Sequence, residues 1–182
     1  MAMTLITTNT SSGASGSAFT SSIDGTYKLY IFKWYDLHPS ANNASLEFNG
    51  SIDGGSNYNV TKTTTYFNSA HNENDNNTNL AYDAARDVAQ GTGYQKLFYK
   101  VDGAASDNAC VGELFLFNPS NTTYVTHFYS TIQTMSYDVS STYSMNSFVS
   151  GYFNTTDNID ALNFQMDSGN MDAGTIKMYG VG

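Results

Sequence analysis

Cysteine, proline and charge are all scarce in this chain of 182 residues. The single cysteine, Cys110, excludes an intrachain disulfide and leaves a cysteine-based zinc site without ligands. Seven scattered basic residues against 16 acidic ones give a net charge of −9, which repels phosphate backbones and excludes nucleic acid as an expected partner. No apolar run is long enough to span a membrane, and the start lacks the basic and apolar regions of a signal peptide. We therefore expect neither a membrane segment nor a secretory signal.

Small polar residues and aromatic residues are abundant instead. The chain contains 21 Ser, 21 Thr and 20 Asn, together with 14 Tyr, 11 Phe and one Trp. Aromatic residues and threonine favour strands, whereas asparagine, glycine and serine favour turns. So many aromatic side chains also exclude a disordered chain. The composition indicates one β-rich domain with a sizeable core.

Nine segments carry strand patterns with turn residues between them. They are residues 27–38, 45–52, 60–70, 94–101, 112–117, 124–135, 146–154, 159–166 and 175–181. The first is apolar on both alternations, which predicts a strand buried on both sides. Residues 80–89 (LAYDAARDVA) predict one short amphipathic helix. Without crossover helices, the pattern predicts an all-β fold, an antiparallel, jelly-roll-like β-sandwich of about nine strands with one short helix.

The N-terminal region differs from the rest in composition. Residues 7–22 (TTNTSSGASGSAFTSS) consist almost entirely of small residues that bury little surface. We predict a flexible or arm-like segment over residues 1–22, either a solvated tail or an arm that docks on a neighbouring subunit. Residues 23–182 are then the single β-sandwich domain.

Motifs of catalysis are missing from the sequence. There is no phosphate-binding loop, no dinucleotide fingerprint, no GxSxG elbow and no HExxH pair. The histidines, His38, His71 and His127, are far apart, and His127 lies in an apolar strand, which is typical of a structural role. We expect no enzymatic activity and assign no catalytic residue. A depolymerase is the alternative, and it would need a cleft with paired carboxylates.

One polar stretch, residues 71–79 (HNENDNNTN), is a candidate metal site. Glu73, Asp75 and Asn77 alternate there and carry oxygen ligands of the kind that Ca²⁺ prefers. The stretch lacks the sixth-position glycine and the twelfth-position glutamate of an EF-hand loop, so a solvated loop that caps the following helix is the alternative. We expect no other cofactor.

A glycan site is a second candidate. Trp34, Tyr58, Tyr137 and Tyr143 carry rings that stack on the CH groups of a sugar, and loop Asp and Asn side chains bond to paired hydroxyls. The alternative for these rings is packing in the core or in an interface.

Four strings of residues carry a resemblance to known proteins. They are residues 30–33 (YIFK) running into 36–40 (DLHPS), residues 113–120 (ELFLFNPS), residues 151–156 (GYFNTT) followed by 159–160, and residues 168–170 running into 174–180 (GTIKMYG). In these strings the chain resembles small virion structural proteins of marine tailed bacteriophages, such as cyanophages. The resemblance extends from about residue 5 to residue 180.

This resemblance implies a non-enzymatic virion protein, a capsid decoration or a head or tail appendage. The expected partners are the chain itself, for instance as a trimer, and other virion proteins, and the expected location is a virion assembled in the host cytoplasm and released by lysis. Assembly would use the N-terminal arm and aromatic-rich faces, since interfaces are enriched in Tyr and Phe and depleted in Lys. The alternative is an adhesin or fibre-tip module that binds host-surface glycan.

Overall fold

Two antiparallel sheets lie face to face in the computed structural model, which describes residues 2–103, 107–138 and 141–182, apart from the side chains of residues 137 and 138. The larger sheet contains, in spatial order, β1 (Met3–Thr10), β12 (Met171–Val181), β3 (Leu29–Pro39), β8 (Cys110–Phe117), β9 (His127–Asp138), β10 (Ser141–Phe153), β5 (Lys62–Asn72) and β6 (Thr78–Tyr82). The smaller contains β2 (Ser17–Phe19), β11 (Ala161–Met166), β4 (Leu46–Ser51) and β7 (Gln95–Lys96). The predicted antiparallel β-sandwich is confirmed.

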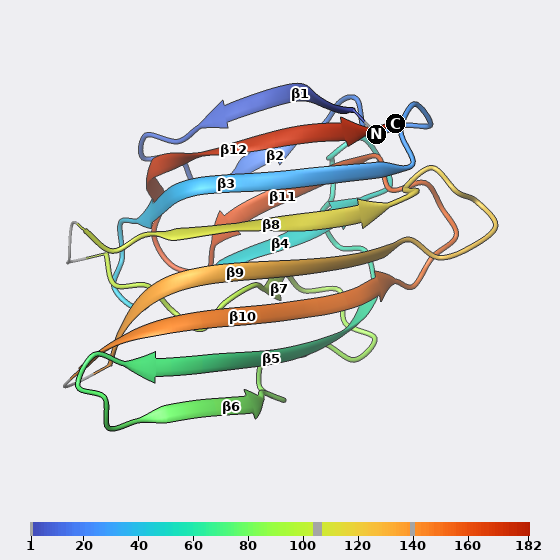
Figure 1. The fold of residues 1–182 in the computed structure, drawn as a ribbon. Helices are drawn as coiled ribbons and strands as arrows, with labels where there is room; N and C mark the ends of the chain where they lie inside the picture. The colour runs from blue at the N-terminus through green and yellow to red at the C-terminus, as the bar shows by residue number, and fades with distance from the viewer. Residues whose placement is uncertain (1, 104–106, 139–140) are drawn as a thin grey trace.

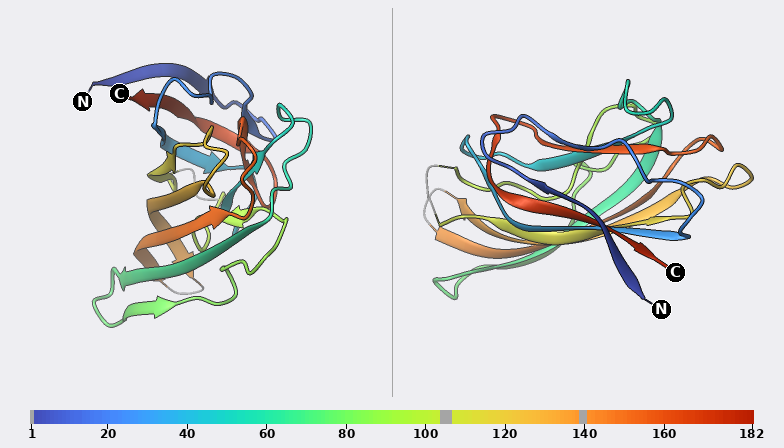
Figure 2. Two further views of the ribbon diagram at one scale, coloured as in Figure 1. Left: turned by 90° about the vertical axis from the view of Figure 1, so that its right-hand side faces the viewer. Right: turned by 90° about the horizontal axis from the view of Figure 1, so that it is seen from above.

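The chain passes repeatedly from one sheet to the other. Each strand of the small sheet is flanked in sequence by two strands of the large one, as in β3–β4–β5 and β10–β11–β12. The small sheet covers only part of the large one, and β5 and β6 extend beyond it (Figure 1). The two layers and the neighbouring chain ends are visible in Figure 2. This unequal coverage leaves part of the inner side of the large sheet without a facing strand.

Aromatic rings fill the space between the sheets. The ring of Phe164 on β11 lies 5.5 Å from Phe32, 6.0 Å from Trp34 and 6.1 Å from Phe48, measured between ring centroids. Contacts of this kind contribute about 0.5–1.5 kcal/mol each beyond area burial. Gly112 pairs with Trp34 across β3 and β8, and a Cβ at this glycine would lie 2.8 Å from the indole Cζ2 atom. The glycine therefore makes room for the largest ring of the core.

The predicted N-terminal arm is wrong, because β1 is part of the large sheet and β2 is part of the small one. β1 pairs with β12 along almost its whole length, and β2 pairs with β11. Ile6 packs against the core, and the backbone N–H groups of Ser11 and Gly13 donate to the carbonyls of Gly174 and Met171. Backbone pairing to an edge strand compensates for the small apolar area of the segment.

The predicted helix over residues 80–89 is also wrong. Residues 78–82 form β6 and pair with residues 67–71 of β5, and a turn follows at Asp83. An isolated helix of about ten residues is marginal in water, whereas pairing with β5 satisfies the backbone of both strands. The described residues contain twelve strands and no helix, so the sandwich has three strands (β1, β2 and β6) beyond the nine predicted.

Candidate functional site

The side of the large sheet that points away from the small sheet, here called the outer face, carries most of the exposed apolar side chains. Among the described residues, eleven large hydrophobic side chains are exposed, and Ile52 and Tyr124 are the two that lie in loops. The other nine are on the outer face: Met3, Leu5, Tyr35, Phe67, Leu80, Tyr82, Val111, Tyr129 and Phe148. Large contiguous apolar patches are rare on soluble monomers and mark interaction sites.

Strand register places three of these side chains, Met3, Leu5 and Tyr129, in two rows together with neighbouring side chains. One row is Leu5, Tyr179, Ile31, Phe115 and Tyr129. The next is Met3, Val181, Leu29, Phe117, His127 and Tyr152. Directly paired side chains lie about 5 Å apart on the same face, and the rings of Phe115 and Tyr129 stack at 4.6 Å between centroids. We call these eleven residues the apolar rows.

The apolar rows contain no carboxylate and no Lys or Arg, although the chain as a whole has a net charge of −9. In the adjacent row, the Nζ of Lys33 lies 2.8 Å from a carboxylate oxygen of Glu113, so these two charges are paired. Lys177 lies beside Lys33 in the same register, with its Nζ 5.5 Å from the centroid of the Tyr35 ring. This part of the outer face therefore carries no unpaired carboxylate, and the negative charge of the chain lies elsewhere.

A groove of about 400 Å³ lies on the opposite side of the large sheet. Its floor is the inward side of β5, β6 and β10, including Asn68, Ala70, Ala81 and Met145, where these strands extend past the small sheet. Unequal coverage by the two sheets therefore exposes this floor. Tyr99, from the segment that follows β7, lines the groove from outside the large sheet.

Further polar groups line the groove along β6 and β10. Asn77, Asn79 and Asp83 come from β6 and its flanks, and Tyr143 comes from β10. The side-chain Nδ2 of Asn77 donates to the Tyr143 hydroxyl at 3.3 Å. The groove thus combines aromatic rings, amides and one carboxylate.

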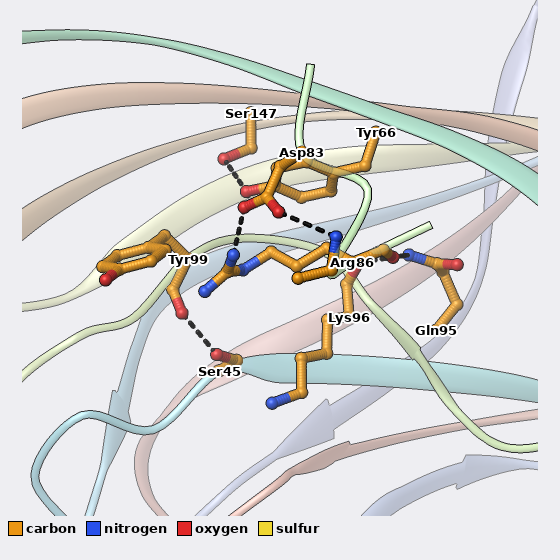
Figure 3. Close-up of polar contacts among 9 residues, drawn as sticks. Ser45, Tyr66, Asp83, Arg86, Gln95, Lys96, Tyr99 and Ser147 are labelled. Atoms are coloured by element: carbon orange, nitrogen blue, oxygen red, sulfur yellow. Dashed lines mark hydrogen bonds and ion pairs between the residues drawn. The ribbon is translucent and has the colours of Figure 1, made fainter. Parts of the chain in front are cut away.

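An arginine holds the Tyr99 side of the groove in place (Figure 3). The Arg86 guanidinium lies over the Tyr99 ring at 4.1 Å from its centroid and forms an ion pair with Asp83. The Arg86 backbone carbonyl accepts a hydrogen bond of 2.9 Å from the buried Gln95 side chain. The guanidinium also lies 6.0 Å from the centroid of the Tyr66 ring, whose hydroxyl bonds to Ser147 at 2.8 Å, and burial raises the pKa of Tyr66. These contacts fix Tyr99 relative to the large sheet.

The four predicted glycan-binding rings have different locations. The prediction that the Trp34 ring stacks on a sugar is wrong, because this side chain is 1% exposed and lies within the core. Tyr58 is half-buried, and its hydroxyl has no hydrogen-bond partner. The side chain of Tyr137 lies outside the described residues. Tyr143 lines the groove, and its half-buried ring is accessible there.

The predicted Ca²⁺ ligands lie in the turn between β5 and β6. Asp75 Oδ1 accepts a hydrogen bond of 3.0 Å from His71 Nε2 when that nitrogen carries a proton, and Asn77 Nδ2 donates to the Tyr143 hydroxyl. The Asn72 side chain organises the turn, because its Oδ1 accepts the backbone N–H groups of residues 76 and 77. Among the described residues no three His, Cys, Asp or Glu side chains gather as a metal site, and Ca²⁺ binding by Glu73, Asp75 and Asn77 stays a prediction.

Lys62 is a buried charged residue that the sequence pattern does not single out. Its side chain is fully buried at the start of β5, and Nζ donates to Asn49 Oδ1 at 2.9 Å and to the carbonyls of Val60 and Gly93. Three acceptors match the three N–H groups of an ammonium. Burial lowers the pKa of Lys62 to about 8, and the nearby Glu47 raises it in part.

The outer face and the groove could not be located from the sequence. The apolar alternation of residues 27–38 predicts burial on both sides, and its second side is instead a signal for the outer face. β3 has one core side and one outer side, on which Tyr35 is 42% exposed. The groove depends on how far β5 and β6 extend past the small sheet, and β6 was expected to be a helix.

Comparison with protein-family models, curated proteins and solved structures finds no match to this chain. The part of the chain that the structure describes contains no helix with the length and apolarity needed to cross a membrane. The outer face and the groove are therefore the two surfaces of the described chain from which a function can be inferred.

Proposed function

We propose that this protein is a non-enzymatic structural subunit of a bacteriophage virion, a decoration or appendage protein that associates with other copies of itself through the outer face. One observation carries the proposal: nine of the eleven exposed large hydrophobic side chains of the described residues lie on this single face. The resemblance of the chain to small phage structural proteins supplies the biological setting.

The size of the outer face fits a stable interface. Eight strands spaced about 4.8 Å apart and about eight residues long span about 900 Å². Specific protein–protein interfaces bury about 800 Å² on each partner. A second copy seated on this face would therefore meet the usual size of a lasting contact.

Charge also favours a second copy. Two chains with a net charge of −9 repel each other over most of their surfaces. The apolar rows lack carboxylates, and the Lys33–Glu113 pair is already neutralised within one chain. Contact through the apolar rows therefore brings no carboxylates of the rows together and removes exposed Tyr and Phe side chains from water.

The test measures native mass by size exclusion with light scattering. We expect the native chain to be a dimer or a larger closed oligomer, and a Tyr129→Lys/Phe148→Lys double variant to be monomeric, since both side chains are exposed on the outer face. Tyr124→Lys is the matched control, because this exposed tyrosine lies in the loop between β8 and β9, and it leaves the mass unchanged. A monomeric native chain, or a double variant that keeps the native mass, contradicts assembly through the outer face.

The virion setting has its own test. An antibody against the chain should detect it in purified particles of the phage that encodes it. Detection in the soluble fraction of the lysate alone contradicts the virion role, whatever the oligomeric state.

A further inference from the structure

The groove beneath β5 and β6 lies on the side of the sheet opposite the apolar rows, so assembly through the outer face does not explain it. Its volume of about 400 Å³ falls within the range of small-molecule sites, which is about 300–1,000 Å³. The groove is open along β6, where Asn77, Thr78 and Asn79 are exposed. An extended ligand can therefore enter it from the side.

The charge of the groove selects against ions. The described lining contains no Lys, Arg or His, and the two cations next to it, Arg86 and Lys100, lie over the Tyr99 ring at 4.1 Å and 5.2 Å from its centroid. Its carboxylate, Asp83, is already paired with Arg86, and one of its oxygens also accepts the backbone N–H of Ala85 at 3.0 Å. A bound cation would have to displace the guanidinium. The chemistry therefore favours a neutral ligand.

The polar groups of the groove fit a ligand with many hydroxyls. Asn79 carries an amide with two donors and an acceptor, and Asn77, which already donates to the Tyr143 hydroxyl, retains a second donor and its acceptor for ligand hydroxyls. Asn79 and Ala81 alternate with exposed outer-face residues along β6, so both lie on the inner side of the strand. The small side chains Ala70 and Ala81 allow a ligand to approach the sheet closely.

Aromatic rings supply the remaining part of a sugar site. Tyr99 and Tyr143 both line the groove and are half-buried, with part of each ring accessible to a ligand. A pyranose ring has apolar CH faces and hydroxyl edges, which match ring walls and amide groups respectively. The Arg86 guanidinium already covers one side of Tyr99 and holds the ring rigidly (Figure 3). A preorganised wall of this kind loses little entropy on binding.

We infer that this groove binds a neutral carbohydrate chain, with Tyr99 and Tyr143 packing against sugar rings and Asn77 and Asn79 bonding to hydroxyls. The site differs from the predicted one, because Trp34 is buried and, of the three predicted rings whose side chains the structure describes, only Tyr143 is in the groove. The inference is independent of the assembly proposal.

The probes are maltohexaose, cellohexaose, laminarihexaose and mannohexaose, with an alginate hexamer as the anionic comparison. Calorimetry measures affinity, and ¹H–¹⁵N spectra follow the side-chain amides of Asn77 and Asn79. We expect at least one neutral hexamer to bind and to shift these amides, and the alginate hexamer to bind at least about tenfold more weakly, a difference of about 1.4 kcal/mol.

Two groove variants and one matched control decide the location. Tyr143→Ala and Asn79→Ala should each weaken binding about tenfold or more, the size of one or two lost hydrogen bonds or ring contacts. Tyr124→Ala is the control, because this exposed tyrosine lies in the loop between β8 and β9, outside both the groove and the apolar rows, and the variant should bind like the native chain. Thermal denaturation verifies that each variant folds.

Three results would overturn the inference. They are no binding to any neutral hexamer, tighter binding of the alginate hexamer than of the neutral ones, and binding that is unaffected by both groove variants. If the native chain forms the expected oligomer but binds none of the sugars, the groove proposal alone is refuted. If the native chain is a monomer that binds sugar, the assembly proposal alone is refuted.

Discussion

Lys62 gives the sharpest test of the core, because it is a fully buried ammonium with only neutral oxygen partners. Its pKa in the folded protein is about 8, well below the ordinary value of 10.5. Between these two pH values the unfolded chain binds a proton that the folded chain has released. The free energy of unfolding therefore rises as the pH rises through this window, and falls back as the pH decreases to about 8.

The size of the effect follows from the two pKa values. Each pH unit between them is worth about 1.4 kcal/mol, so full deprotonation contributes about 3 kcal/mol. At about pH 9.5, before most tyrosines ionise, the expected gain over neutral pH is about 2 kcal/mol. For a domain of this size, that is a rise in Tm of about 4–8 °C.

Urea denaturation at pH values from about 7 to 9.5 measures this gain, and the native chain is compared with Lys62→Met. We expect the variant to lose the alkaline rise, whereas Lys28→Met, which removes an exposed lysine, retains it. An NMR titration of the Lys62 side-chain nitrogen in the native chain gives the pKa directly and does not depend on the variant folding. The reasoning is refuted if the free energy of unfolding rises equally with pH in the native chain and both variants, or if the NMR titration of Lys62 has its midpoint near pH 10.5.

Two further predictions concern single contacts. Gly112→Ala should lower the free energy of unfolding by about 1–3 kcal/mol, because the new Cβ would lie 2.6 Å from the Thr131 carbonyl oxygen and 2.8 Å from the Trp34 ring. The control is Gly25→Ala, which has open space around the new Cβ and should change the free energy of unfolding by less than about 0.5 kcal/mol. Chemical denaturation compares the two variants. The Asp53 carboxyl should titrate near pH 2, because hydrogen bonds from Asn57 and Ser51 to the carboxylate lower its pKa to about 2, and an NMR midpoint near the ordinary value of 3.8 would contradict this.

The fold class could be predicted from the sequence because the central strands have strong local patterns. Leu46 and Phe48 alternate with polar residues and pack into the core, and turn residues delimit the neighbouring strands. The segments with weak patterns were assigned wrongly. β1, β2 and β6 contain few buried apolar residues, and their pairing to β12, β11 and β5 is decided by the partner strand rather than by their own sequence.

Of the candidate residues that the sequence singles out and whose side chains the structure describes, only Tyr143 and Asn77 line the groove. Composition indicates that aromatic rings are present, but the direction of each ring depends on strand register, where a shift of one residue exchanges the two faces. Trp34 and Tyr35 are neighbours in sequence, yet one is in the core and the other is 42% exposed on the outer face. The groove also requires the relative extent of two sheets, which is a property of tertiary structure.

The apolar alternation of β3 connects the sequence with the proposed assembly. A strand that is apolar on both sides is expected to be buried on both sides, but within one chain the outer side of β3 faces away from the small sheet. Ile31 is covered by its row neighbours, whereas Tyr35 remains 42% exposed. A second copy on the outer face would complete the burial that the sequence indicates. Because the groove lies on the opposite side of the same sheet, that contact would leave two grooves per dimer free, and a polymer that spans both would bind by avidity, more tightly than either groove alone.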